Sequence, residues 1–123
     1  MSEAIRITCR FDVNRCSPNL RQHWRVRAKH TKAAREAGRQ AWLEAGSPVA
    51  SGPVRVSLLV RRARKLDQAN LWSSAKGLLD GVFVGALTPD DGERWVKLGS
   101  VTQESGKAWK LREECVLVVE PLP

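Results

Sequence analysis

Alternating apolar and polar positions mark the extended parts of the chain. Apolar side chains occupy every second position over residues 5–11 and again over residues 54–60. A period of two places those side chains on one face of a sheet and predicts two half-buried strands. Two further extended segments, Trp95–Thr102 and Lys110–Glu120, flank a turn around residues 104–107. We expect these two segments to form a terminal hairpin.

Helical patterns separate the strands. Residues Leu20–Ala45 are rich in Ala, Arg, Lys and Glu and contain no proline, which predicts a long helix. We expect its buried side to comprise Trp24, Ala28, Ala34, Ala37, Ala41 and Trp42. A second helix is predicted over residues 68–83, where apolar side chains recur at helical spacing. These side chains are Leu71, Ala75, Leu78, Leu79 and Val82.

The order β-α-β-α-β-β predicts a small α/β (α+β) fold, with a mixed sheet of about four strands and two helices packed on it. A length of 123 residues suits one domain with its own core, so we expect residues 1–123 to form a single domain. No apolar run approaches the roughly 18 residues of a membrane span. The first residues also lack the pattern of a secretory signal. We therefore expect a cytoplasmic protein with no membrane partner.

The charge of the chain is unevenly distributed, and this distribution indicates a class of binding partner. Residues 1–65 hold fifteen Lys and Arg against four Asp and Glu, whereas residues 66–123 hold six against nine. The net charge is +8. A strongly basic half is typical of proteins that bind a polyanion, most often nucleic acid. The cations expected to contact DNA phosphates are Arg21, Arg25, Lys29, Arg61, Arg62 and Arg64.

Candidate chemistry centres on the second predicted helix. Lys76 and Asp80 lie opposite its apolar stripe, Asp67 precedes it, and Asp90 and Asp91 follow in a loop. A loop that returned toward the helix start would bring Asp67 and Asp91 together. Gathered carboxylates favour a divalent cation such as Mg²⁺, which activates water and stabilises charge during attack on a phosphate. Lys76 would neutralise part of that charge.

Each of these residues also has a purely structural interpretation. Asp67 is well placed as a helix N-cap, and the segment 89–92 is favourable turn sequence. Lys76 and Asp80 have the spacing of an ordinary helical ion pair. The three cysteines, at positions 9, 16 and 115, lack the spacing of a zinc site or a disulfide framework.

Four segments carry a resemblance to a known family. They are residues 65–71, residues 76–81, residues 89–91, and residues 17–21 followed by His23-Trp24. In this order and spacing they resemble the RusA family of Holliday-junction resolvases, most closely its bacteriophage and prophage-type members. The resemblance implies a homodimeric α/β endonuclease that binds four-way DNA junctions. It also implies paired nicks made with Mg²⁺ or Mn²⁺.

The resemblance assigns roles to particular residues. In the family's Asp-x-Asp-Asn-Leu motif, Asp67 matches the first acid and Ala69 stands at the second. Asp91 matches the metal-associated residue of the Asp-Asp loop, and Asp90 is its neighbour. Lys76 matches the helix lysine, three residues further from the motif than in the shortest family version. The implied catalytic positions are therefore 67, 69, 76 and 91, and the implied metal ligands are Asp67, Asp90 and Asp91.

Ala69 departs from the family motif, because alanine has no oxygen with which to hold a cation. We therefore expect impaired nicking. The alanine is either a natural loss or a deliberate Asp-to-Ala change, and the intact neighbouring motif residues favour the second. Two other functional interpretations stay open. One is a non-catalytic branched-DNA binding protein with a vestigial site, and the other is a basic module that docks on an acidic protein.

Overall fold

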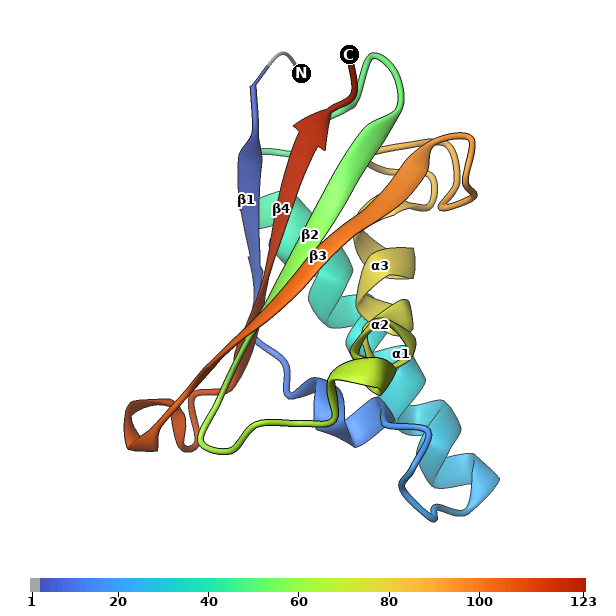
Figure 1. The fold of residues 1–123 in the computed structure, drawn as a ribbon. Coiled ribbons are helices and arrows are strands. Elements are labelled where there is room, and N and C mark those ends of the chain that lie inside the picture. The colour runs from blue at the N-terminus through green and yellow to red at the C-terminus, as the bar shows by residue number, and fades with distance from the viewer. Residues whose placement is uncertain (1–2) are drawn as a thin grey trace.

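Four strands form one mixed sheet in the order β1-β4-β2-β3 in the computed structural model, which describes residues 3–123 (Figure 1). The strands are β1 (Ile5–Cys9), β2 (Val54–Arg62), β3 (Val96–Ser105) and β4 (Glu114–Pro121). β4 is antiparallel to both β1 and β2, whereas β2 and β3 are parallel. The expected mixed sheet of a small α/β fold is thus confirmed.

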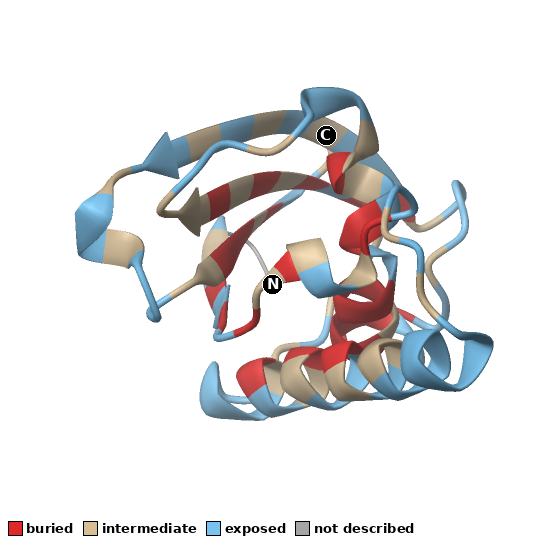
Figure 2. Cartoon of the chain, turned by 90° about the horizontal axis from the view of Figure 1, so that it is seen from below, coloured by how far each residue is buried: buried red, intermediate tan, exposed pale blue. Residues whose placement is uncertain are grey.

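The helices cover one face of this sheet (Figure 2). They are α1 (Trp24–Glu44), the short α2 (Leu71–Ser74) and α3 (Lys76–Phe83). Three single turns of 3₁₀ helix complete the elements: η1 (Val13–Cys16), η2 (Gln68–Asn70) and η3 (Lys107–Trp109). Within residues 3–123, no helix is long and apolar enough to cross a membrane.

The hydrophobic core lies between the sheet and the helices. The alternating apolar residues of β1 and β2 are buried there, except Ile5, which is partly buried, as the period of two predicted. The five apolar side chains predicted for the second helix, from Leu71 to Val82, are also buried. Phe83 adds the largest fully buried side chain at the end of α3.

The predicted terminal hairpin is wrong, because β3 and β4 are not neighbours in the sheet. β4 inserts between β1 and β2, and its consecutive residues Cys115, Val116 and Leu117 are all buried. Burial on both faces is typical of a central strand. β3 lies at the sheet edge, where most of its residues stay in contact with solvent, and α2 and α3 provide the crossover from β2.

Both predicted helices also need correction. The first begins at Trp24 rather than Leu20, with the His23 ring accepting a hydrogen bond from the Arg25 N–H at 3.2 Å. Trp24 and Ala28 are exposed, because the first turns of α1 extend beyond the sheet (Figure 1). The second predicted helix is divided into η2, α2 and α3, with a break at Ala75, whose ψ is −1°.

Glycine residues let α1 and α3 pack with their backbones close together. A Cβ atom at Gly81 would lie 2.1 Å from the Arg35 carbonyl oxygen, and one at Gly38 would lie 2.4 Å from that of Leu78. Arg39 of α1 reinforces the contact, since its guanidinium donates to the Gly81 and Val84 carbonyl oxygens at 2.7 and 2.8 Å. These bonds satisfy carbonyls at the end of α3 that have no partner within the helix.

We predict that Gly81→Ala lowers the free energy of unfolding by about 2 kcal/mol or more, because backbone must move to admit the methyl group. Urea unfolding of the purified chain measures this change. Gly52→Ala is the matched control, because a Cβ atom at Gly52 meets nothing within 4 Å. Equal stability of the two variants would show that the helix contact is less tight than described.

Candidate functional site

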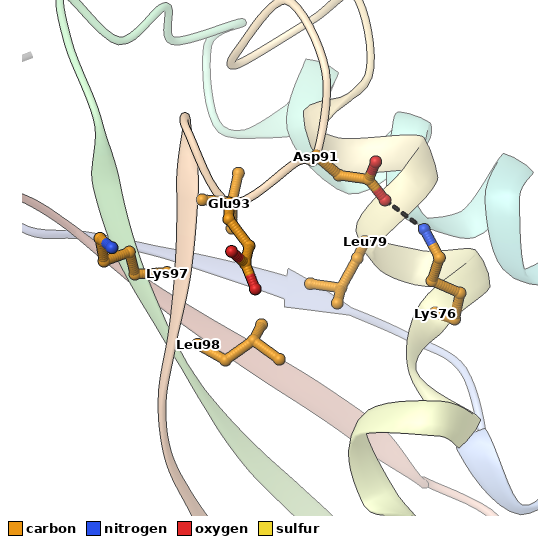
Figure 3. Close-up of a pocket in the computed structure, with 7 residues that line it drawn as sticks. Lys76, Leu79, Asp91, Glu93, Lys97 and Leu98 are labelled. Atoms are coloured by element: carbon orange, nitrogen blue, oxygen red, sulfur yellow. Dashed lines mark hydrogen bonds and ion pairs between the residues drawn. The ribbon is translucent and has the colours of Figure 1, made fainter.

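An ion-paired cluster joins α3 to the loop that leads into β3. Lys76, the first residue of α3, donates through Nζ to Oδ1 of Asp80 at 2.8 Å. The same Nζ donates to Oδ2 of Asp91 (Figure 3). Asp80 lies one turn further along the helix, whereas Asp91 comes from the loop. The folded chain therefore brings together two of the residues that the sequence predicted for the site, Lys76 and Asp91.

The cluster borders a cleft of about 500 Å³ between α3 and the start of β3. Leu79, Val96 and Leu98 give the cleft an apolar side, and Lys76, Asp91 and Glu93 give it a charged one (Figure 3). Glu93 and Leu98 were not predicted from the sequence. They enter the cleft because β3 begins beside α3, and local sequence carries no signal for that placement.

The charges in the cluster stabilise one another. The hydrogen bond from Lys76 is the main reason that the pKa of Asp91 is lowered, with a further contribution from Asp80. In turn, hydrogen bonds to Asp80 and Asp91 raise the pKa of Lys76. Asp91 is thus a carboxylate and Lys76 an ammonium at neutral pH. With Asp80 included, the cleft has three acidic groups, Asp80, Asp91 and Glu93, beside two cations, Lys76 and Lys97.

Asp67 lies in a different hollow. Its carboxylate accepts hydrogen bonds from the Ala69 N–H and from Nδ2 of Asn70, both at 3.2 Å, and so caps η2. The hollow, of about 130 Å³, is also lined by Ser17 and Asn19 from the amino-terminal segment. The hydrogen bonds of Asp67 are thus made within η2, whereas Asp91 accepts from Lys76, and the predicted meeting of Asp67 with Asp91 stays a prediction.

Asp90, the remaining predicted ligand, has a turn role. Its Oδ1 accepts a hydrogen bond from the Gly92 N–H at 2.8 Å, and its carbonyl oxygen accepts one from the Thr88 hydroxyl at 2.5 Å. These bonds shape the loop that presents Asp91. The structural interpretations of Asp67 and Asp90 from sequence, as a cap and as a turn residue, both describe contacts that the chain makes.

The side chains present do not fit a divalent cation as they stand. Lys76 donates to two carboxylates that a cation would need, and Ala69 offers no oxygen. Across residues 3–123, no three His, Cys, Asp or Glu side chains are grouped so as to hold a metal ion. A complete set of oxygen ligands would need an acid at position 69 and a rearrangement of the Lys76 pairs.

Two of the arginines predicted to contact DNA are engaged within the protein. Arg61 pairs with Glu104 and Glu114 at 3.0 and 2.9 Å. Arg62 pairs with Asp12 at 2.8 Å and also donates to the Arg64 carbonyl oxygen at 2.9 Å. These contacts largely neutralise the charges of Arg61 and Arg62. Among the three arginines predicted to contact DNA in residues 61–64, Arg64 is the exposed one.

The other predicted DNA contacts gather at the start of α1. Arg21, Arg25 and Lys29 are all exposed. Residues 20–35 contain six Lys and Arg and no Asp or Glu. This segment is called the α1 basic surface below. Lys32 pairs with Glu36 of the same helix at 4.0 Å, and the other five cations have no ion-pair partner within the described part of the chain.

No protein-family model matches this chain, and no curated protein is similar to it. The functional interpretation therefore depends on the residues and contacts described above.

We predict that Lys76→Met raises the pKa of Asp91, because the hydrogen bond that lowers it is lost. A pH titration of the Asp91 carboxyl carbon by NMR measures this directly. The folded pKa of Asp91 lies below its unfolded value, so the Lys76 pair stabilises the fold at neutral pH. That contribution is lost as acid protonates Asp91. Lys97→Met, at the same cleft, should leave the titration unchanged; an unchanged Asp91 in Lys76→Met would contradict the pairing.

Proposed function

We propose that this chain binds branched DNA of the four-way-junction class, and that it is a RusA-like resolvase whose nicking is impaired by Ala69. The α1 basic surface is the observation that carries the binding half of the proposal. Exposed arginines without acidic neighbours suit phosphate oxygens, because the guanidinium donates to two oxygens at once. DNA contacted in this way is recognised by backbone position and shape.

The arrangement around Asp67 supports the resolvase half. Residues 17–21 and residues 65–71 carry the resemblance to the RusA family, although 43 residues separate them in the sequence. In the folded chain Ser17 and Asn19 line one hollow with Asp67 and Asn70. Segments that resemble the same family are thus neighbours in space, as expected if they serve one site.

Lys76 is suited to contact a phosphate at the cleft between α3 and β3. An ammonium has three donors, and two of them are used by Asp80 and Asp91. The third can donate to a phosphate oxygen, since the Lys76 side chain is 61% exposed. A bound Mg²⁺ or Mn²⁺ would supply the Lewis acidity for phosphate attack. With alanine at position 69, we expect the chain to hold junctions and cut them poorly.

A non-catalytic branched-DNA binding protein is the second candidate. The pairing of Lys76 with both Asp80 and Asp91 favours it, because it leaves the acidic residues in pairs and caps rather than in one ligand set. Both candidates share the α1 basic surface and the junction substrate. They differ in whether an acid at position 69 creates activity.

We predict that replacing Arg21, Arg25 and Lys29 together by Gln weakens junction binding at least about tenfold and lowers the salt slope by about two to three. Fluorescence anisotropy over a range of salt concentrations measures both quantities. The control variant replaces Arg6, Arg55 and Arg94, which are exposed cations outside α1. An equal loss in the two triple variants would indicate nonspecific attraction and count against the α1 basic surface.

We predict that Ala69→Asp raises Mg²⁺-dependent nicking of a synthetic four-way junction by about two orders of magnitude or more, with little change in affinity. Adding Asp91→Asn should remove the gain. Ser73→Asp places an acid elsewhere on the same exposed side of this region and should not produce it. Junction binding without cutting by Ala69→Asp would favour the non-catalytic candidate.

A further inference from the structure

Trp24, at the first position of α1, is an aromatic side chain that the fold leaves in solvent. It is 67% exposed, although an indole ring of this size contributes most to stability when it is buried. Its neighbours are also solvent-facing, since every residue from Trp24 to Lys29 is exposed. The core therefore does not account for a tryptophan at this position.

Polar and charged groups border the Trp24 ring. The His23 ring stacks against it, with 5.6 Å between centroids and 29° between planes. The guanidinium carbon of Arg25 lies 5.2 Å from the Trp24 ring centroid. A cation over the ring is held by the electron-rich face of the indole, so Arg25 and Trp24 stabilise each other's placement.

A shallow hollow of about 440 Å³ adjoins the ring on the surface of α1. Trp24 forms one wall, and the cations Arg27, Lys32 and Arg35 line the rest together with Ala28 and Thr31. Arg27 is held in place by a bond from its Nη2 to the Leu20 carbonyl oxygen at 2.9 Å. An aromatic wall beside several cations offers a π-surface and phosphate contacts within one site.

This combination matches the chemistry of an unpaired nucleotide. Every base has a π-face that can stack on an aromatic side chain, and its phosphate carries the negative charge that the cations attract. An acidic protein segment would satisfy the cations but would leave the indole without a stacking partner. A fully paired duplex would likewise satisfy the cations only, because its bases are already stacked.

We propose that Trp24 and the adjoining hollow form a stacking site for an unpaired base of branched DNA. This inference rests on the proposed DNA-binding function and adds to it a specificity for bases that are open at or near the branch point. The α1 basic surface attracts the phosphates of any DNA, whereas Trp24 distinguishes open bases from paired ones.

The test compares three DNA ligands: a fully paired junction, a junction with unpaired thymines at the branch point, and a duplex of equal length. We expect Trp24→Ala to weaken binding to the junction with unpaired bases by about tenfold, within the range for stacking on an aromatic side chain. Duplex affinity and the salt slope should not change. Trp24→Phe, which keeps a ring, should retain most of the preference. Leu43→Ala removes another exposed apolar side chain, 51% exposed, from the far end of α1 and should have no effect.

A fluorescent adenine analogue placed as the unpaired base gives a second readout. Stacking on the indole should quench its emission with the wild-type chain but not with Trp24→Ala. Tight junction binding that Trp24→Ala leaves unchanged would overturn the stacking site and leave the proposed function intact. Equal weakening on all three ligands would also overturn it, because a general phosphate contact would explain that result. If the wild-type chain binds none of the three ligands, the proposed function and the stacking site both fail.

Discussion

The close approach of α1 to α3 is the contact on which the rest of the arrangement depends. Gly38 and Gly81 allow backbone to meet backbone, so the two helices pack at a separation that side chains would prevent. Lys76 begins the helix that this contact positions, and the loop bearing Asp91 leaves from its other end. The positions of Lys76, Asp80 and Asp91 therefore depend on the contact between α1 and α3, which Gly38 and Gly81 make possible.

Charge is distributed unevenly between α1 and the cleft beside α3. The α1 basic surface has six cations and no acid, whereas the cleft beside α3 is lined by two cations and two acids. In the proposed function, the α1 basic surface is the part that attracts DNA phosphates. Internal pairs at Arg61 and Arg62 sharpen this contrast, because they neutralise cations that the sequence alone places in the basic half.

Part of this structure could be predicted from local pattern. The period of two in β1 and β2 and the apolar stripe from Leu71 to Val82 depend on near neighbours in sequence, and all of these were correct. Strand pairing could not be predicted in the same way. β3 and β4 are consecutive in the chain, but the burial of Cys115–Leu117 on both faces favours a central place for β4.

The candidate site could also be predicted only in part. The sequence predicted Lys76 and Asp91 as site residues. It did not predict which residue Asp91 contacts, because that depends on the path of the loop, and tertiary packing sets this path. Trp24 was expected on the buried side of the first predicted helix, yet this helix starts beyond the sheet and leaves the ring in solvent. Helical periodicity describes which residues share a side of α1; it does not say how far the sheet extends beneath them.

The position of β4 has a consequence for how the chain acquires its fold during synthesis. β1 pairs with β4 alone, so residues 5–9 have no strand partner until residues 114–121 have been made. Until then, α1 can pack only on an incomplete sheet, and the apolar side of β1 stays uncovered on one edge. Contacts between such distant parts of a chain form slowly. Residues 114–121 must therefore leave the ribosome before the sheet is complete, and until then the edge of β1 is open to non-native strand pairing.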